Sequence, residues 1–528
     1  MPRSQHAGKN DNASKDDLQT KKGLFNLLML SPIPSADYAA DAFLRAQYLP
    51  SVRNEGEELP PYFSSDSFSD KAAEELAKLA AHRACCPIEY RTRRFDGLVR
   101  IMGLPHPVPY ARLVHTVKTH WDDLVPKLLS TSSMIKPSFH ADHRLVTMDY
   151  GTSVGKTADL TRAAQGKQYL VEADISNCFP SMYTHAVDWA LRTKPVAKTN
   201  RNSGWEHELD QRLQSINDGE TKGILIGPVI SNVISELVLQ RVDEQIRKIN
   251  VSFVRNIDDY TAFFRTRQQA ELFVAQLETE LSEYRLHLNA KKTHIESTRH
   301  GIGERWINEI NSYMPKSRGA LGVVRFLQQS EALAMDFPQR SVVRYAAKAV
   351  LSRRRHKRPN HRDVLIIDEL LRISFFHPEI LCFLVGHIQW AVKELTAEDK
   401  DRISVQLLDQ MSEAIRRRET DSMLWAIFGI QVLHRARKIS RAHCDGLIAT
   451  DDDLVWSALA TVSQVGRRRV RVAVQTVDKN DHEAREHHWL SRYELFRVGD
   501  LALTSLHPDE VLWFNVAIGQ NVAFTQLQ

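Results

Sequence analysis

Asp258 and Asp259 are the residues whose types and spacing point most directly to chemistry. They stand side by side within residues 253–264, a stretch otherwise rich in apolar and aromatic side chains. That composition favours β-strands on both sides of the pair. Two adjacent carboxylates at the bend of a hairpin raise the free energy of the folded chain unless a positive charge lies beside them. A divalent metal ion would supply that charge.

A third carboxylate, Asp174, ends a short apolar segment that begins at residue 169. It is far from the aspartate pair in sequence, so only a fold could bring the three together. Their oxygens suit Mg²⁺, for which Mn²⁺ could substitute. Two such ions, about 3.5–4 Å apart, would promote in-line phosphoryl transfer. The alternative is a plain turn at the pair and a helix cap at Asp174, because Asp is common at both places.

The segment between these sites contains Gly223 and Gly227, followed by a helix-compatible run that begins near Pro228. Glycine allows a backbone to approach a base or a template strand closely. Proline suits the first turn of the helix that follows. The alternative is an ordinary loop before a buried helix.

The order of these segments resembles the palm of a reverse transcriptase. Four segments resemble the family's motifs A to D in chain order: residues 174–179, 223–232, 256–259 and 286–293. The run Leu104-Pro105-His106-Pro107 resembles a fingers signature of bacterial reverse transcriptases. The resemblance covers roughly residues 60–335. It implies an α+β fold, with right-hand polymerase fingers and an antiparallel palm sheet packed with helices.

The resemblance also implies roles for the matched residues. Asp174 and Asp258 would bind two Mg²⁺ ions, Asp259 would support them, and Ile175 would offer its backbone carbonyl. Phe179 would be the steric gate that excludes a 2′-hydroxyl and so favours deoxynucleotides. The alternative for Phe179 is a core aromatic.

Further roles follow from the same resemblance. Gly227 and Ser231 would line the nascent base pair and the template. Lys292 would protonate the leaving pyrophosphate, and Arg144 would contact the triphosphate from the fingers. The alternatives for Lys292 and Arg144 are ordinary surface charges.

Two positions depart from the usual family pattern. Asn256 stands where most reverse transcriptases have an aromatic residue, and Ile226 replaces a polar residue before Gly227. Neither change removes a carboxylate. The motif B version and residues 179–185 are similar to those of the abortive-infection and defence-associated reverse transcriptases of bacteria.

Composition agrees with a polymerase of this kind. A chain of 528 residues with 43% hydrophobic content predicts two or three domains. The net charge is +5, and the five cysteines include no Cys-x-x-Cys pair, so we expect a reducing cytoplasm and no structural zinc. No apolar run reaches the length that spans a bilayer, so no membrane partner is expected.

We expect three regions along the chain. Residues 1–22 predict a disordered tail, residues 23–335 the fingers and palm, and residues 336–528 an all-α, HEAT-like array of amphipathic helices. Four basic clusters in the last region favour a nucleic-acid groove over solvated helix faces: Arg353-Arg354-Arg355-His356-Lys357-Arg358, Arg416-Arg417-Arg418, Arg435-Ala436-Arg437-Lys438, and Arg467-Arg468-Arg469 with Arg471.

These observations predict a cytoplasmic bacterial RNA-directed DNA polymerase of the defence-associated group. Its expected partners are dNTPs, a DNA product, a noncoding RNA that serves as template or scaffold, and further copies of the chain. Three alternatives stay open. They are a retron or group II intron-like enzyme, a template-independent and protein-primed DNA polymerase, and a decayed palm that serves as an RNA-binding scaffold.

Overall fold

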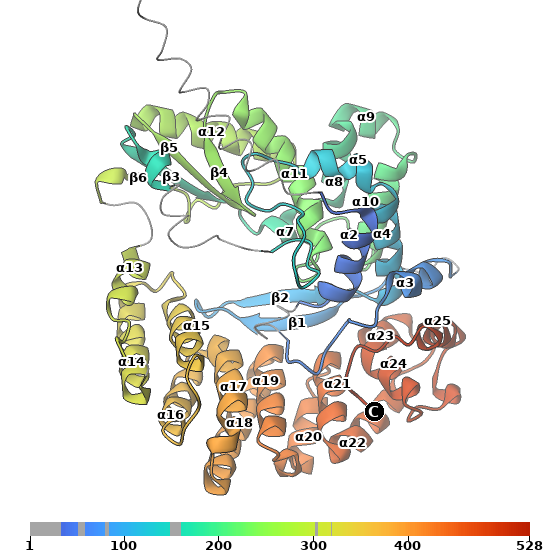
Figure 1. Cartoon of the computed structure of the whole chain (residues 1–528). Helices are drawn as coiled ribbons and strands as arrows, with labels where there is room; N and C mark the ends of the chain where they lie inside the picture. The colour runs from blue at the N-terminus through green and yellow to red at the C-terminus, as the bar shows by residue number, and fades with distance from the viewer. Residues whose placement is uncertain (1–32, 51–58, 80–83, 148–159, 301–304, 318) are drawn as a thin grey trace, which may run out of the picture.

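The computed structural model describes residues 33–50, 59–79, 84–147, 160–300, 305–317 and 319–528. The tail expected over residues 1–22 lies outside the described residues. Helices and strands are mixed in the first part of the chain, and helices alone make up the second part (Figure 1). None of the described helices is both long enough and apolar enough to cross a membrane.

A four-stranded antiparallel sheet forms the palm, with strand order β4-β5-β3-β6. Its strands are β3 (Tyr169–Asp174), β4 (Phe253–Asn256), β5 (Asp259–Phe264) and β6 (His294–Ser297). Helix α12 (Arg267–Glu283) packs on this sheet. The Phe273 ring of α12 lies against Phe253 and Phe264, so aromatic burial joins the helix to the strands that carry the aspartate pair.

In Figure 1, further helices lie to the right of the palm sheet and a two-stranded hairpin lies below it. The hairpin strands are β1 (Ile88–Arg93) and β2 (Val99–Leu104), which pair antiparallel. The helices are α2 (Ala36–Asp41), η1 (Ala42–Ala46), α3 (Asp70–Ala77), α4 (Pro107–Thr119), α5 (Trp121–Leu128), α7 (Cys178–Ser181), α8 (Thr184–Arg192), α9 (Lys194–Thr199), α10 (Trp205–Ser215), α11 (Ile230–Arg247) and the one-turn η2 (Thr298–His300).

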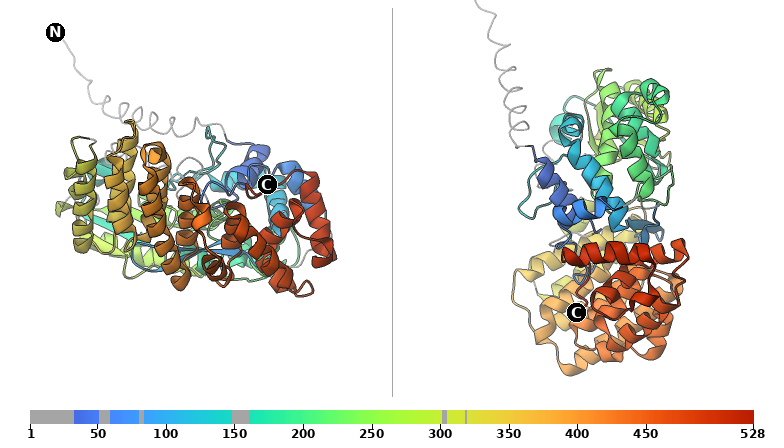
Figure 2. Two further views of the ribbon diagram at one scale, coloured as in Figure 1. Left: turned by 90° about the horizontal axis from the view of Figure 1, so that it is seen from below. Right: turned by 90° about the vertical axis from the view of Figure 1, so that its right-hand side faces the viewer.

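The second part of the chain is a row of helices beneath the palm and the hairpin in Figure 1, and it forms a separate layer in the right-hand view of Figure 2. Its α-helices are α13 (Arg305–Ser312), α14 (Ala320–Asp336), α15 (Val342–Arg355), α16 (Asp363–Ser374), α17 (Leu381–Ala391), α18 (Ala397–Arg417), α19 (Thr420–Val432), α20 (Arg441–Ile448), α21 (Asp453–Val462), α22 (Gln464–Thr476), α23 (His482–His487), α24 (Trp489–Arg497) and α25 (Pro508–Gly519). Single 3₁₀ turns are η3 (Pro378–Ile380), η4 (Val392–Glu394), η5 (Ala436–Lys438) and η6 (Leu503–Ser505).

Local sequence explains where several array helices begin. Thr396 and Ser440 each form a capping box at the first turn of the helix that follows. Asp452 and Asp481 also cap helices with their side chains. Such caps satisfy backbone N–H groups at helix starts, which allows short connections between antiparallel neighbours. Helix α14 packs on α15 and α16, although it ends at Asp336, where the array is expected to begin.

Polar contacts join the array to the fingers. Arg93 of β1 donates from Nη1 to Glu419 at 2.9 Å, and the Tyr62 hydroxyl donates to the Leu424 carbonyl at 3.2 Å. All but the arginine are buried. The hairpin therefore packs on the array.

Cys85, His106 and Glu486 form a third contact between fingers and array, with ligand-type atoms within 4.8 Å of one another. Nδ1 of His106 accepts a hydrogen bond from the Val108 N–H at 3.2 Å. The neutral ring therefore carries its proton on Nε2, which lies 3.5 Å from Glu486 Oε2. A protonated Nε2 cannot bind a metal, so in this tautomer the cluster is a buried polar contact between fingers and array.

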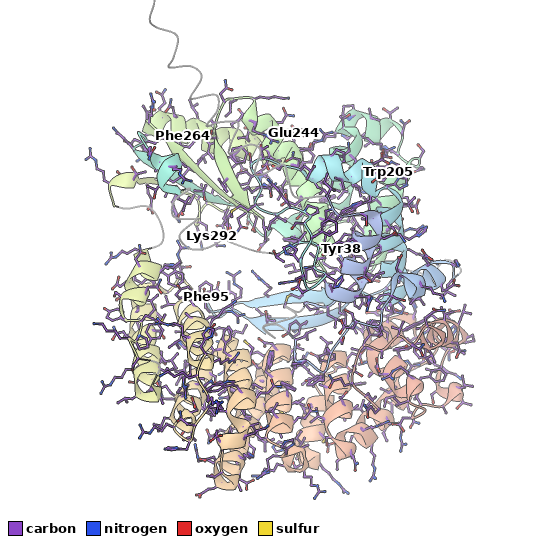
Figure 3. All side chains as sticks on the ribbon, viewed as in Figure 1. Tyr38, Phe95, Trp205, Glu244, Phe264 and Lys292 are labelled. Atoms are coloured by element: carbon purple, nitrogen blue, oxygen red, sulfur yellow. The ribbon has the colours of Figure 1, made fainter. Side chains whose placement is uncertain are left out.

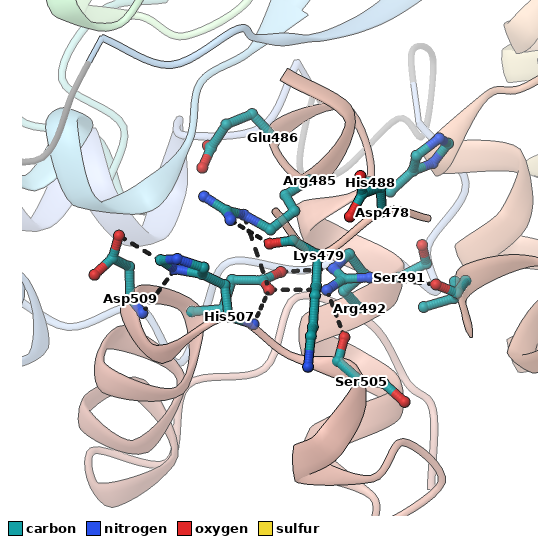
Figure 4. A network of polar contacts seen from close by, with 12 residues as sticks. Asp478, Lys479, Arg485, Glu486, His488, Ser491, Arg492, Ser505, His507 and Asp509 are labelled. Carbon is teal, nitrogen blue, oxygen red and sulfur yellow. Dashed lines mark hydrogen bonds and ion pairs between the residues drawn. The ribbon is translucent and has the colours of Figure 1, made fainter. Parts of the chain in front are cut away.

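A buried ion pair closes the far end of the array (Figure 4). Arg492 of α24 donates to both oxygens of Glu510, at 2.6 and 2.8 Å, and to the Ser505 carbonyl at 3.0 Å. The backbone N–H of His507 donates to the same carboxylate at 2.8 Å. These bonds tie α24 to the start of α25.

Arg492→Ala is expected to lower the free energy of unfolding of the array by about 3–5 kcal/mol, because Glu510 would stay buried without its partner. Thermal unfolding followed by circular dichroism measures the effect. Arg267→Ala, which removes an exposed pair with Glu271, is the control and should cost about 1 kcal/mol at most. Equal melting of the two variants would contradict this assignment.

Candidate active site

Three carboxylates converge at one end of the palm sheet. Antiparallel pairing of β3 with β5 places Asp174 opposite Asp259, and Asp258 lies in the turn that precedes Asp259. The Ile175 N–H donates to the Asp258 carbonyl at 3.2 Å, which joins the end of β3 to this turn. Two distant segments thus bring three anionic side chains together.

The turn between β4 and β5 has only two residues, Ile257 and Asp258, because Asn256 pairs with Asp259. Ile257 has a φ of 55°, a left-handed conformation that a β-branched residue rarely adopts. Backbone of this kind costs about 1–3 kcal/mol and is found where surrounding structure enforces it. One bond that enforces it comes from Arg255, whose Nη1 donates to the Ile257 carbonyl at 2.8 Å.

Crowding of the carboxylates shifts their protonation. Burial, followed by the charge of Asp174, raises the pKa of Asp258. Although Asp259 lies at the exposed rim, partial burial and the charges of Asp258 and Asp174 raise its pKa to about 7. Neighbouring carboxylates repel one another when they are ionised, so a cation that binds among them lowers the free energy of the site.

Lys292 and Asn289 occupy the two side-chain oxygens of Asp174. Lys292 Nζ lies 3.1 Å from Oδ1, and the Asn289 amide donates to Oδ2 at 3.1 Å. The Asn289 N–H also donates to the Asp174 carbonyl at 2.7 Å. Lys292 is half exposed and lies on the side of the palm that faces the hairpin (Figure 3). Its ammonium stands where a metal's positive charge is expected.

Asn289 was not anticipated as a site residue. Its position within residues 286–293 was the available signal, since the motif D segment was expected beside the palm. The side chain's direction toward Asp174 depends on the backbone bridge between Ile175 and Leu288, which a local sequence pattern does not reveal.

The loop before α11 lies against the fingers strand β2. The Gly103 N–H donates to the Ile226 carbonyl at 2.7 Å. Gly227 has a φ of 135°, and a Cβ there would lie 3.1 Å from the Gly103 carbonyl oxygen. Glycine at 227 is therefore explained by the close approach of two protein backbones. Ser231 is buried, and its hydroxyl has no hydrogen-bond partner among the described residues.

Residues 112–328 match the family model described as reverse transcriptase (RNA-dependent DNA polymerase). This chain carries a reverse transcriptase domain. The description of that family names the activity of an RNA-dependent DNA polymerase. No curated protein matches the sequence.

Solved structures similar to this chain include telomerase from Candida albicans in complex with a TWJ fragment of telomeric RNA (9% identity, TM-score 0.29), with coverage of 66% of this chain and 65% of that one. Apo telomerase from Candida tropicalis is another (9% identity, TM-score 0.31), with coverage of 67% and 70%. The chain thus spans about 65% of the length of the first of these proteins. Likeness at these scores is too distant to assign function.

Phe179 and Arg144 are two further predicted site residues of the reverse transcriptase domain, and their roles stay predictions. Phe179 lies in α7 and is partly buried against the main core. Arg144 donates from Nε to Asp142 at 2.7 Å. Burial and the charge of Asp174 raise the pKa of Asp258, and the positive charge of Arg100 on β2 opposes part of that rise, so Arg100 is a fingers cation whose charge acts at the site.

A cavity of about 440 Å³ is lined by residues of both the hairpin and the array. Its lining combines guanidinium groups, aromatic rings and small polar side chains: Tyr90, Thr92, Arg93, Arg94, Phe95, Arg100, Met102, Ser341, Arg344, Pro378, Glu379, Cys382, Asp421 and Trp425. Figure 3 shows Phe95 near the end of the hairpin.

Some residues of the basic clusters of the array are paired with acidic partners. Arg354 is buried on Asp363. The other pairs between cluster residues and acids are Arg416 and Arg417 with Glu413, Arg435 and Lys438 with Asp401, Arg467 with Asp500, and Arg469 with Asp445. Part of this charge therefore joins helices to one another, as for Arg354 with Asp363 and Arg469 with Asp445. The nucleic-acid groove stays a prediction.

Metal affinity is expected to rise with pH up to about 7, because protons compete with the metal for Asp259, whose pKa is raised. In the metal-free fold the same shift lowers stability as the pH rises from the ordinary Asp range toward 7. Isothermal titration of Mn²⁺ at about pH 6 and pH 8 measures the difference. Asp259→Asn should reduce the pH dependence, and an unchanged dependence would contradict the assignment.

Proposed function

We propose that this chain synthesises DNA from deoxynucleotides in bacterial anti-phage defence, as an RNA-directed polymerase of the abortive-infection and defence-associated group. The observation that carries the proposal is the convergence of Asp174, Asp258 and Asp259, with Lys292 Nζ 3.1 Å from Asp174 Oδ1. The proposed domains are residues 23–335 for fingers and palm and residues 336–528 for a HEAT-like array.

The residues at the sheet end fit a pair of Mg²⁺ ions, since the acids raise one another's pKa and a lysine ammonium already stands among them. Asp174 and Asp258 would hold the ions, with Asp259 and the Ile175 carbonyl in support. Bound Mg²⁺ would activate the attacking hydroxyl and stabilise charge on the transferred phosphoryl group.

The chain's own side chains would position the nucleotide and move its protons. Lys292 would turn from Asp174 toward the leaving pyrophosphate and donate a proton to it, a contribution that typically amounts to about 10²–10⁴-fold in rate. Phe179 would exclude a 2′-hydroxyl. Arg100, with Arg144 in a lesser role, would hold phosphate oxygens from the fingers, and Gly227 and Ser231 would support the base-pair pocket.

The partners proposed are dNTPs, a noncoding RNA as template or scaffold, a DNA product, and further copies of the chain, in the bacterial cytoplasm. Family resemblance supports the defence role and the RNA. The guanidinium-lined cavity beside β1 and β2 supports contact with phosphate groups.

Purified protein with its copurifying RNA, Mg²⁺ and four dNTPs is expected to make DNA whose sequence is complementary to that RNA. Asp258→Ala should reduce synthesis by more than about 100-fold, because removal even of outer metal-site groups costs about 10–100-fold. Product sequencing distinguishes the alternatives. Random DNA attached to protein would instead support untemplated, protein-primed synthesis. No DNA with either Mg²⁺ or Mn²⁺ would support an RNA-binding scaffold.

Phe179→Ala is expected to admit ribonucleotides, with discrimination between dNTP and rNTP reduced by roughly 10–200-fold, the usual effect of a small steric change in a pocket. Single-nucleotide incorporation kinetics measure the ratio. Phe263→Leu, in the palm core, is the control and should leave the ratio unchanged. Unaltered discrimination in Phe179→Ala would show that this ring is only a core aromatic.

A further inference from the structure

The guanidinium of Arg255 lies beneath the turn that carries the aspartate pair, and the residue is fully buried. Its Nη1 donates to the Ile257 carbonyl at 2.8 Å. Ile257 is held in the left-handed region, with a φ of 55°. Because a β-branched side chain disfavours that conformation, the bond from Arg255 stabilises a turn that the chain would otherwise avoid.

Two carboxylates of α11 fix the orientation of this guanidinium. Glu236 accepts from Nη1 at 2.7 Å and from Nη2 at 2.9 Å. Asp243 accepts from Nε at 3.1 Å and from Nη2 at 2.8 Å. Paired bonds to a planar fork define direction as well as distance, so Arg255 cannot turn away from Ile257 without breaking several bonds.

Asp243 is completed by two hydroxyl groups. The Tyr260 hydroxyl donates to Oδ1 at 3.0 Å, and the Ser130 hydroxyl donates to Oδ2 at 3.3 Å. Glu236 and Asp243 are both buried. A fully bonded polar cluster of this kind has one arrangement that satisfies all its members, which makes it a rigid base for the turn above.

Stability alone does not account for the cluster. Buried ion pairs are often no more stabilising than apolar side chains of the same volume, and their clearest use is to specify one geometry. Here one donor of the fork points out of the cluster and onto the backbone carbonyl that precedes Asp258. The cluster therefore has a direct connection to the position of a carboxylate.

We propose that Arg255 is a positioning residue for metal binding, which sets the place of Asp258 relative to Asp174 by holding the Ile257 carbonyl. The inference rests on the proposed function, because it assigns this turn to metal ligation. Glu236 and Asp243 belong to α11, the helix that begins just after Gly227. Their bonds to Arg255 therefore also fix the position of the turn relative to this helix. The metal site and the loop that contacts the fingers thus share one helix as their common support.

Arg255→Lys tests the proposal. Lysine keeps the positive charge for Glu236 and Asp243 but lacks the planar fork that also reaches Ile257. We expect the Mg²⁺ concentration at half-maximal DNA synthesis to rise by about 10–100-fold, the usual effect of changing a group that orients a metal ligand, with a smaller change in KM for dNTP. Mn²⁺ binding without substrate, measured by electron paramagnetic resonance, should weaken by a similar factor.

A control and a rescue separate positioning from stability. Tyr260→Phe removes a hydrogen bond to Asp243 but leaves the bond from Arg255 to Ile257, so it should lower the melting temperature without changing Mn²⁺ affinity. Arg255→Lys combined with Ile257→Gly should recover much of the affinity, because glycine adopts a positive φ readily.

A folded Arg255→Lys protein with wild-type Mn²⁺ affinity would overturn the proposal, as would an equal loss of affinity in Tyr260→Phe. If Arg255→Lys does not fold, the charge-balanced variant Arg255→Gln/Glu236→Gln/Asp243→Asn takes its place, and the same weakened binding is expected. Wild-type protein that binds Mn²⁺ but makes no DNA would remove the proposed function and leave the positioning role in place.

Discussion

Repulsion among three carboxylates is the constraint on which this site depends. Antiparallel pairing places Asp174 opposite Asp259, and a two-residue turn adds Asp258. Because the carboxylates are partly buried and repel one another, the pKa values of Asp258 and Asp259 are raised. A nearby ammonium, that of Lys292, offsets part of the charge. The backbone of the turn is also strained at Ile257. The buried cluster around the Arg255 guanidinium stabilises this turn.

The helical array acts on this site through the fingers hairpin. Arg93 of β1 pairs with Glu419, and the cavity beside it is lined by guanidinium groups from both the hairpin and the array, including Arg100 and Arg344. The charge of Arg100 opposes part of the rise in the pKa of Asp258 that burial and Asp174 cause. The array therefore holds the hairpin whose cations act near the carboxylates, and this is the physical link between the two parts of the chain.

Strand ends and chain order were enough to predict that Asp174 would meet the aspartate pair, since an antiparallel palm sheet brings such ends together. Sequence was insufficient where a role depends on a partner's direction. Asn289 reaches Asp174 because a backbone bridge joins Ile175 and Leu288. Arg255 contacts the turn through the Ile257 carbonyl, two residues away in sequence. The array's arginines, such as Arg354, look alike in sequence, but burial against an acid separates a structural arginine from one available to phosphate. Gly227 approaches the fingers backbone closely, and its role beside a base pair stays a prediction.

The central claim is that the end of the palm sheet binds two divalent ions. Anomalous diffraction from crystals grown with Mn²⁺ and a non-hydrolysable dNTP tests it most directly. The account predicts two peaks about 3.5–4 Å apart, bounded by Asp174 and Asp258, with Lys292 displaced from Asp174. A nucleotide bound without metal at these carboxylates, or Mn²⁺ bound elsewhere with the Lys292–Asp174 pair intact, would contradict the account.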